Sequence, residues 1–120
     1  MVIAVTAQGN DLQSEVDPRF GRTKHFLLVD SETMQFEVVE NEQSLTLPQG
    51  AGIQAAQIVT NHQAEVVLTG NCGPKAFKTL EAAGIKVVVG VNGRIEDAVQ
   101  AYLQGEVRPA TAANVEGHWG

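Results

Sequence analysis

The single cysteine of this 120-residue chain lies in a turn whose residue types could bind an anion or a metal. The turn reads Gly70-Asn71-Cys72-Gly73-Pro74-Lys75, between an apolar run and a segment with helical spacing. Free N–H groups and the positive dipole end of a helix converge there, so the turn would attract an anion or lower the pKa of the Cys72 thiol. The same pattern also fits an ordinary turn that contains a small buried thiol.

Three histidines could add an imidazole to such a site. His118 lies in the terminal residues 117–120, beside the only tryptophan, Trp119. Chain ends are usually disordered unless something holds them, and docking of the indole ring would bury a large apolar area. We therefore predict that His118 completes or covers a site at Cys72, in the same chain or in a partner; a tail that packs by chance is the alternative. His25 begins a predicted strand and His62 follows a predicted helix, where the helix dipole alone favours histidine.

Five of the eight basic residues lie near two predicted loops at one edge of the fold: Arg19, Arg22, Lys24, Lys75 and Lys78. The formal net charge of the chain is -6, so this local positive balance suits an anion. A structural role is the alternative, in which Arg19 and Arg22 pair with nearby carboxylates and fix the long loop of residues 7–23, since most ion pairs at protein surfaces are structural or neutral.

Composition limits the class of protein. A chain of 120 residues with 43% hydrophobic residues is sufficient for one compact domain with a real core. The net negative charge argues against nucleic acid as the main partner, and one cysteine excludes an internal disulfide. The sequence has neither a signal-peptide pattern nor an apolar stretch long enough to span a bilayer, so we expect a cytoplasmic protein without a membrane partner.

Apolar periodicity predicts an α/β domain in residues 1–105, followed by a tail in residues 106–120. Strands are expected at residues 2–6, 25–30, 34–40, 65–69 and 85–89, and helices at residues 51–61, 74–83 and 95–104. The second and third strands form a hairpin with Met34, Phe36 and Val38 on one face, and the later strands alternate with helices, which favours parallel pairing. We expect a three-layer α/β/α domain with a five-stranded mixed sheet. The loop after the first strand and the Cys72 turn should face each other at the carboxyl edge.

Three ordered blocks resemble the dinitrogenase iron–molybdenum cofactor biosynthesis family. They are Asp17-Pro18-Arg19-Phe20-Gly21-Arg22, Gly50-Ala51-Gly52-Ile53-Gln54-Ala55-Ala56 and Gly70-Asn71-Cys72-Gly73-Pro74-Lys75-Ala76-Phe77. The resemblance covers residues 1 to about 105 and implies a fold similar to ribonuclease H. It also implies that the protein binds or carries iron–sulfur or iron–molybdenum cofactor precursors. Many members have a histidine near the glycines of the second block, where this chain has Pro48-Gln49-Gly50, and a C-x-x-C motif is absent.

The function we predict is binding or carrying an anionic metal–sulfur cluster, without enzymatic activity. The predicted cluster-binding residues are Arg19, Phe20, Gly21, Arg22, Gly70, Asn71, Gly73 and Lys75, and the predicted metal ligands are Cys72 and His118. Ordinary iron–sulfur clusters use four cysteines, so one cysteine implies a cluster shared across a homodimer or held by hydrogen bonds and charge. Proteins that donate and receive the cluster are the expected partners.

Two other functions remain open at this point. One is a protein–protein interaction module without its own ligand. The other is a hydrolase of phosphates or nucleic acids, by analogy with the fold. Metal-dependent nucleases need clustered carboxylates, and the first strand, residues 2–6, carries none.

Overall fold

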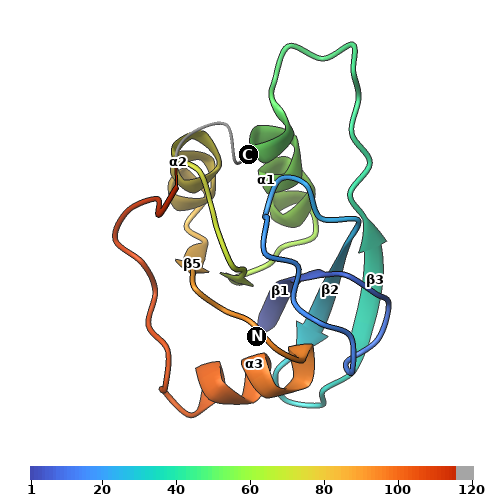
Figure 1. The fold of residues 1–120 in the computed structure, drawn as a ribbon, viewed down its shortest axis with the longest axis vertical. Coiled ribbons are helices and arrows are strands. Elements are labelled where there is room, and N and C mark those ends of the chain that lie inside the picture. The colour runs from blue at the N-terminus through green and yellow to red at the C-terminus, as the bar shows by residue number, and fades with distance from the viewer. Residues whose placement is uncertain (116–120) are drawn as a thin grey trace.

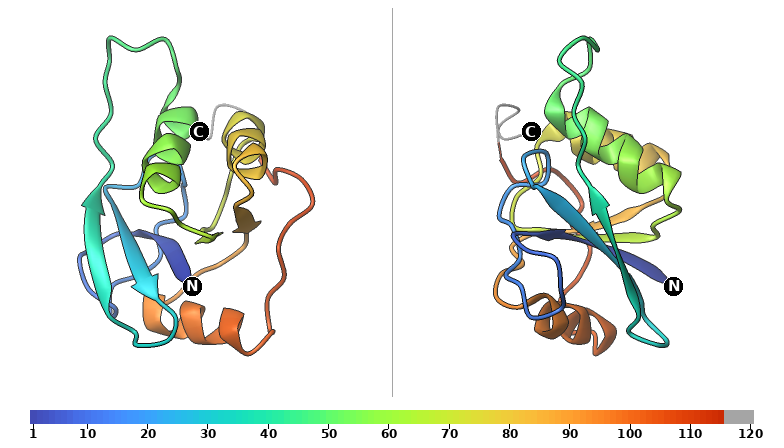
Figure 2. Two further views of the ribbon diagram at one scale, coloured as in Figure 1. Left: turned by 180° about the vertical axis from the view of Figure 1, so that it is seen from behind. Right: turned by 90° about the vertical axis from the view of Figure 1, so that its right-hand side faces the viewer.

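The computed structural model of the protein describes residues 1–115. A five-stranded sheet lies between two helices on one face and a third helix on the other (Figures 1 and 2). The elements in chain order are β1 (Val2–Ala7), β2 (His25–Asp30), β3 (Phe36–Glu40), α1 (Ala51–Asn61), β4 (Val66–Leu68), α2 (Pro74–Ala82), β5 (Lys86–Val88) and α3 (Ile95–Leu103). The predicted three-layer α/β/α architecture is therefore confirmed, whereas the implied likeness to ribonuclease H stays a prediction.

The sheet has the order β3-β2-β1-β4-β5 and is mixed, as predicted. The strands β1, β4 and β5 are parallel neighbours, and β2 runs antiparallel to both β1 and β3. The central strands β1 and β4 are buried on both faces, which explains their continuous apolar sequences. Their carboxyl ends lead into the two loops that were expected to face each other.

Two apolar clusters lie on opposite faces of the sheet. Side chains alternate along β1, so Ala4 packs towards α1 and α2, whereas Ile3 and Val5 pack towards α3. The first cluster includes Val59 of α1 and Leu80 of α2, both fully buried. The cluster beneath α1 and α2 also contains Cys72, and this position decides the chemistry of its thiol.

The edge strand β3 begins two residues later than predicted. Met34 has a φ of 62°, in the left-handed region, so it belongs to the turn and cannot continue the extended strand. Phe36 and Val38 do share one face, opposite Val29 and Leu27 of β2. They are 40% and 36% exposed at the edge of the sheet.

Helix lengths bear on the membrane prediction. The longest helix in residues 1–115 is α1, with 11 residues, whereas about 20 apolar residues are needed to cross a bilayer. Within the residues described, no helix has the length and apolarity of a membrane span.

Candidate functional site

The two predicted loops meet at the carboxyl edge of the parallel strands. Arg19 and Asn71 form an isolated parallel bridge. The Phe20 amide donates to the Asn71 carbonyl at 3.1 Å, and the Asn71 side-chain amide donates to the Pro18 carbonyl at 2.9 Å. A Cβ atom on Gly70 would lie 2.7 Å from Pro18 Cα, so only glycine allows this approach. The predicted juxtaposition of the two loops is confirmed.

Cys72 itself lies in the core. Its side chain is fully buried in the cluster beneath α1 and α2. Burial raises the pKa of the thiol from 9.0 to about 12, because the apolar surroundings disfavour the charged form. The predicted lowering of the pKa by the helix N-terminus is therefore wrong, since desolvation outweighs the helix dipole. The thiol is neutral at physiological pH, and the ligand role of Cys72 stays a prediction that would require the thiol to lose its proton.

Asn114, which the sequence analysis missed, closes the Cys72 turn from outside. The backbone N–H of Cys72 donates to Asn114 Oδ1 at 2.8 Å, and the backbone N–H of Asn114 donates to the Cys72 carbonyl at 3.2 Å. Asn114 Nδ2 also donates to the Gly70 carbonyl at 3.3 Å. The segment leading to Asn114 passes β5, where the Ala110 amide donates to the Val87 carbonyl at 2.7 Å. As far as the described residues extend, this segment thus returns to the carboxyl edge.

The other predicted residues divide between core and surface. Phe20 is fully buried, with its ring centroid 5.7 Å from that of Phe26, so it supports the fold. Gly73 is the N-cap residue of α2, and Lys75 is exposed in the first turn of that helix. Arg19 is exposed, and it lines a shallow cavity.

Two of the three histidines are described. His25 begins β2 opposite Ala7, at the carboxyl end of β1, and His62 is the C-cap residue of α1. His25 Nδ1 lies 3.0 Å from Glu40 Oε1, and His62 Nδ1 lies 2.9 Å from the Ile58 carbonyl. Both contacts are local and explain these histidines structurally. His118 lies outside the described residues, so its predicted role stays a prediction.

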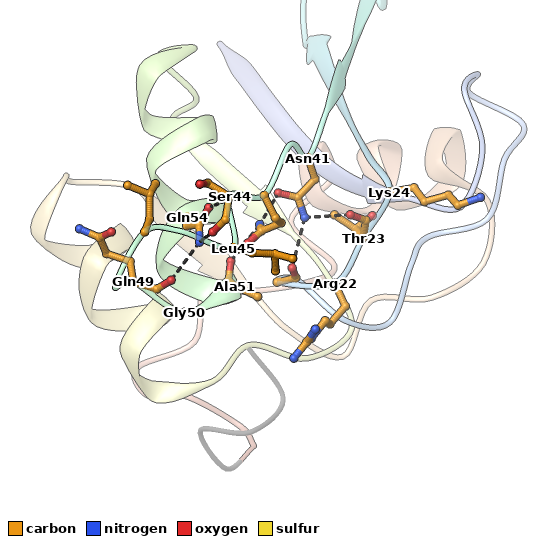
Figure 3. Close-up of a pocket in the computed structure, with 13 residues that line it drawn as sticks. Arg22, Thr23, Lys24, Asn41, Ser44, Leu45, Gln49, Gly50, Ala51 and Gln54 are labelled. Carbon is orange, nitrogen blue, oxygen red and sulfur yellow. Dashed lines mark hydrogen bonds between the residues drawn. The ribbon is translucent and has the colours of Figure 1, made fainter.

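A cavity of about 550 Å³ opens beside the α1 N-terminus, and we call it the α1 pocket (Figure 3). Its walls are residues 21–24, Ala51 and Gln54 of α1, and seven residues of the loop between β3 and α1: Asn41, Gln43, Ser44, Leu45, Leu47, Gln49 and Gly50. Arg22 and Lys24 line it, and none of the 13 residues drawn around it is acidic. Gly50 is the N-cap of α1, and the first turn of α1 contains no acidic residue. The pocket therefore has the charge and the helix dipole that favour an anion.

Buried amides fix the walls of the α1 pocket. Gln54 is only 7% exposed, and its Nε2 atom donates to the carbonyls of Ser44 and Gln49 at 3.0 and 2.9 Å. The Ser44 amide donates back to Gln54 Oε1 at 2.7 Å. On the opposite wall, Asn41 Nδ2 donates to the carbonyls of Gly21 and Thr23. The base of the loop is thus anchored on both sides.

These anchors were not predicted from the sequence, because no helix, strand or site residue was expected in residues 41–50. The only signal was the block around Gly50 and Gln54, which carries the family resemblance. Residues 1–115 contain no group of three or more His, Cys, Asp or Glu side chains that could coordinate a metal ion.

Comparison of the sequence with known protein families identifies the family of this chain. The family described as "Dinitrogenase iron-molybdenum cofactor" matches residues 1–105. The chain belongs to this dinitrogenase iron–molybdenum cofactor family. The matched residues include the two meeting loops, the Cys72 turn and the α1 pocket.

Solved structures of similar chains agree with this family and with the fold. The apo form of the orange protein from Desulfovibrio gigas is 50% identical, with a TM-score of 0.89, and the match covers 95% of this chain and 96% of that one. A putative NifB protein from Thermotoga is 33% identical, with a TM-score of 0.80 and coverage of 97% and 98%. Among sequence relatives, an uncharacterised protein of Methanocaldococcus jannaschii is 27% identical over 110 residues, 89% of each chain.

Proposed function

We propose that the protein binds and carries an anionic metal–sulfur cluster, or a precursor of one, in the α1 pocket. One observation carries the proposal: Arg22, Lys24 and the N-terminal turn of α1 surround one cavity without an acidic side chain, in a chain of net charge -6. The family is related to an iron–molybdenum cofactor, and the similar orange protein has an apo form, which implies a group that it can also bind.

The mode of binding follows from the residues present. Four-cysteine ligation is excluded because the chain has one cysteine, and that thiol is buried and protonated. Charge and hydrogen bonds from Arg22, Lys24 and the α1 N–H groups would hold the anion instead. Such contacts break without ligand exchange, which suits a cargo that is received from a donor protein and passed to a recipient. No covalent step is required, so we propose a carrier and not an enzyme.

Charge reversal at Arg22 tests this proposal. Tetrathiomolybdate, a dianion built from molybdenum and sulfur, serves as the probe, and its binding is measured by anaerobic absorbance titration. Arg22→Glu should weaken binding at least tenfold, because the attraction between Arg22 and the anion becomes a repulsion, a change of about 1–2 kcal/mol at an exposed site. Raising the salt concentration should weaken the residual binding further.

Lys86→Glu is the matched control. It changes the net charge equally, but Lys86 is exposed at the start of β5, at the opposite edge of the sheet. Its binding constant should equal that of the wild type. Unchanged binding in Arg22→Glu, with a lower melting temperature, would contradict the proposal and assign Arg22 to the structure of the loop.

A second candidate function is a regulatory protein–protein interaction module. The observation that favours it is the half-exposed pair Phe36 and Val38 on the edge strand β3. Edge strands offer unpaired backbone groups to other chains. This function would be favoured if the purified protein took up no metal during anaerobic reconstitution.

A further inference from the structure

Two leucines of the α1 pocket are exposed to solvent. Leu45 is 100% exposed and Leu47 is 49% exposed, and both line the same cavity as Arg22 and Lys24. Single exposed apolar residues are common on protein surfaces. Leu45 and Leu47 thus add an apolar surface to the lining of a cavity that also includes two cationic side chains.

The loop that carries these leucines is anchored next to them. Ser44 is held by both amide atoms of Gln54, and its hydroxyl lies 2.9 Å from the Thr46 hydroxyl. The Gln49 carbonyl on the other side of the tip is held by Gln54 as well. These bonds fix the backbone on both sides of the leucines, whose exposed side chains line the pocket and are open to contact with a bound anion.

We propose that Leu45 and Leu47 make the α1 pocket selective for large, weakly hydrated thio-anions over oxyanions of the same charge; this inference rests on the proposed function. An oxyanion beside leucine methyl groups loses hydrogen bonds to water that the methyl groups cannot replace. Sulfur is larger and more polarisable than oxygen, so a thio-anion of equal charge loses less hydration and gains more dispersion energy there. The Arg22 guanidinium is itself weakly hydrated and suits the same ligand.

Comparison of tetrathiomolybdate with molybdate separates the contribution of charge from that of the leucine contacts. Both ions are tetrahedral dianions of the same metal and differ in carrying sulfur or oxygen. Equilibrium dialysis with molybdenum analysis gives both affinities. The wild type should bind tetrathiomolybdate at least tenfold more tightly than molybdate. The double variant Leu45→Ser/Leu47→Ser should lose about tenfold in tetrathiomolybdate affinity, which corresponds to partial burial of two leucines, and less than twofold in molybdate affinity.

Leu103→Ser is the control, because Leu103 is 39% exposed at the end of α3, on the other side of the sheet. It should leave both affinities unchanged. In spectra of methyl-labelled leucine, the Leu45 and Leu47 signals should shift on addition of tetrathiomolybdate, and the Leu103 signals should not.

The outcomes that overturn the inference differ from those that overturn the proposed function. Equal affinity of the wild type for both anions, equal losses in the double variant, or unshifted Leu45 and Leu47 signals would overturn the selectivity and leave the anion site in place. Failure of the wild type to bind either anion would overturn both proposals.

Discussion

The Cys72 turn and the α1 pocket look alike in sequence and differ in the structure. Each precedes a helix whose N-cap is a glycine without a side-chain cap, Gly73 for α2 and Gly50 for α1. Pro18 fills the space around the Cys72 turn, and Asn114 satisfies its backbone. The α1 pocket stays open and basic. A helix N-terminus therefore stays open to a ligand only where no other segment of the chain covers it.

Adding a side chain within the Cys72 turn should have the largest effect on the stability of the protein. Gly70→Ala places a Cβ atom 2.7 Å from Pro18 Cα and 2.8 Å from its carbonyl oxygen. Both are backbone atoms, so the two loops must separate, and we expect the free energy of unfolding to fall by about 3 kcal/mol. Chemical denaturation measures this loss.

Gly50→Ala is the matched change at the α1 pocket. A Cβ atom there meets nothing within 4 Å, so stability should change by less than about 1 kcal/mol, as expected at a helix N-cap. Equal losses in the two variants would contradict the contrast between a filled turn and an open pocket.

The raised pKa of Cys72 predicts a loss of stability at alkaline pH. The folded protein keeps the thiol protonated up to pH about 12, whereas the unfolded chain releases the proton above pH 9.0. The stabilisation is complete below pH 9.0 and is lost as the pH rises towards 12, by about 1.4 kcal/mol per pH unit. Denaturation at several pH values should show this slope in the wild type and not in Cys72→Ala.

The same variant tests the ligand role predicted from the sequence. A buried thiol should contribute packing alone, so Cys72→Ala should bind tetrathiomolybdate as tightly as the wild type. Loss of binding without loss of folding would instead make Cys72 a ligand and would contradict its assignment to the core.

Opening the turn from outside should have a smaller effect. Asn114→Ala removes the 2.8 Å bond to the Cys72 amide and the bond to the Gly70 carbonyl. We expect a loss of about 1–2 kcal/mol and hydrogen exchange at the Cys72 amide about tenfold faster. Asn92→Ala, at an exposed position, serves as the control. Unchanged exchange at Cys72 would show that Asn114 does not close the turn.

The smallest effect concerns His118. If it covers the site from the tail, as the sequence predicts, His118→Ala should weaken anion retention about threefold, the loss of one weak contact. His62→Ala is the control, since His62 contacts its own helix. Equal retention of the anion by the wild type and both variants would show that His118 has no part in the site.

Local pattern predicted most of the fold correctly. The buried runs of β1 and β4, the alternation of Phe36 and Val38 in β3, and Pro74 at the start of α2 each depend on neighbouring residues. The start of β3 was predicted too early, because the left-handed conformation of Met34 is set by the turn and has no signal in a residue of that type.

The candidate site was predicted less well, because its contacts join distant segments. Arg19 and Arg22 were placed at the correct edge. Asn41, Leu45 and Gln54 were not assigned to a site, since a polar linker does not reveal which of its residues will line a cavity. Phe20 was predicted to contact the bound cluster, whereas its ring packs against Phe26 in the core.

The sequence by itself determined the order of the elements, the mixed sheet and the gathering of basic residues at its carboxyl edge. These features follow from periodicity and from topological rules that act along the chain. Only the tertiary structure decided which helix start is covered and what pKa the thiol has. Asn71 meets Pro18 across 53 positions, and Cys72 meets Asn114 across 42. Burial depends on such distant contacts, and burial sets the protonation of Cys72.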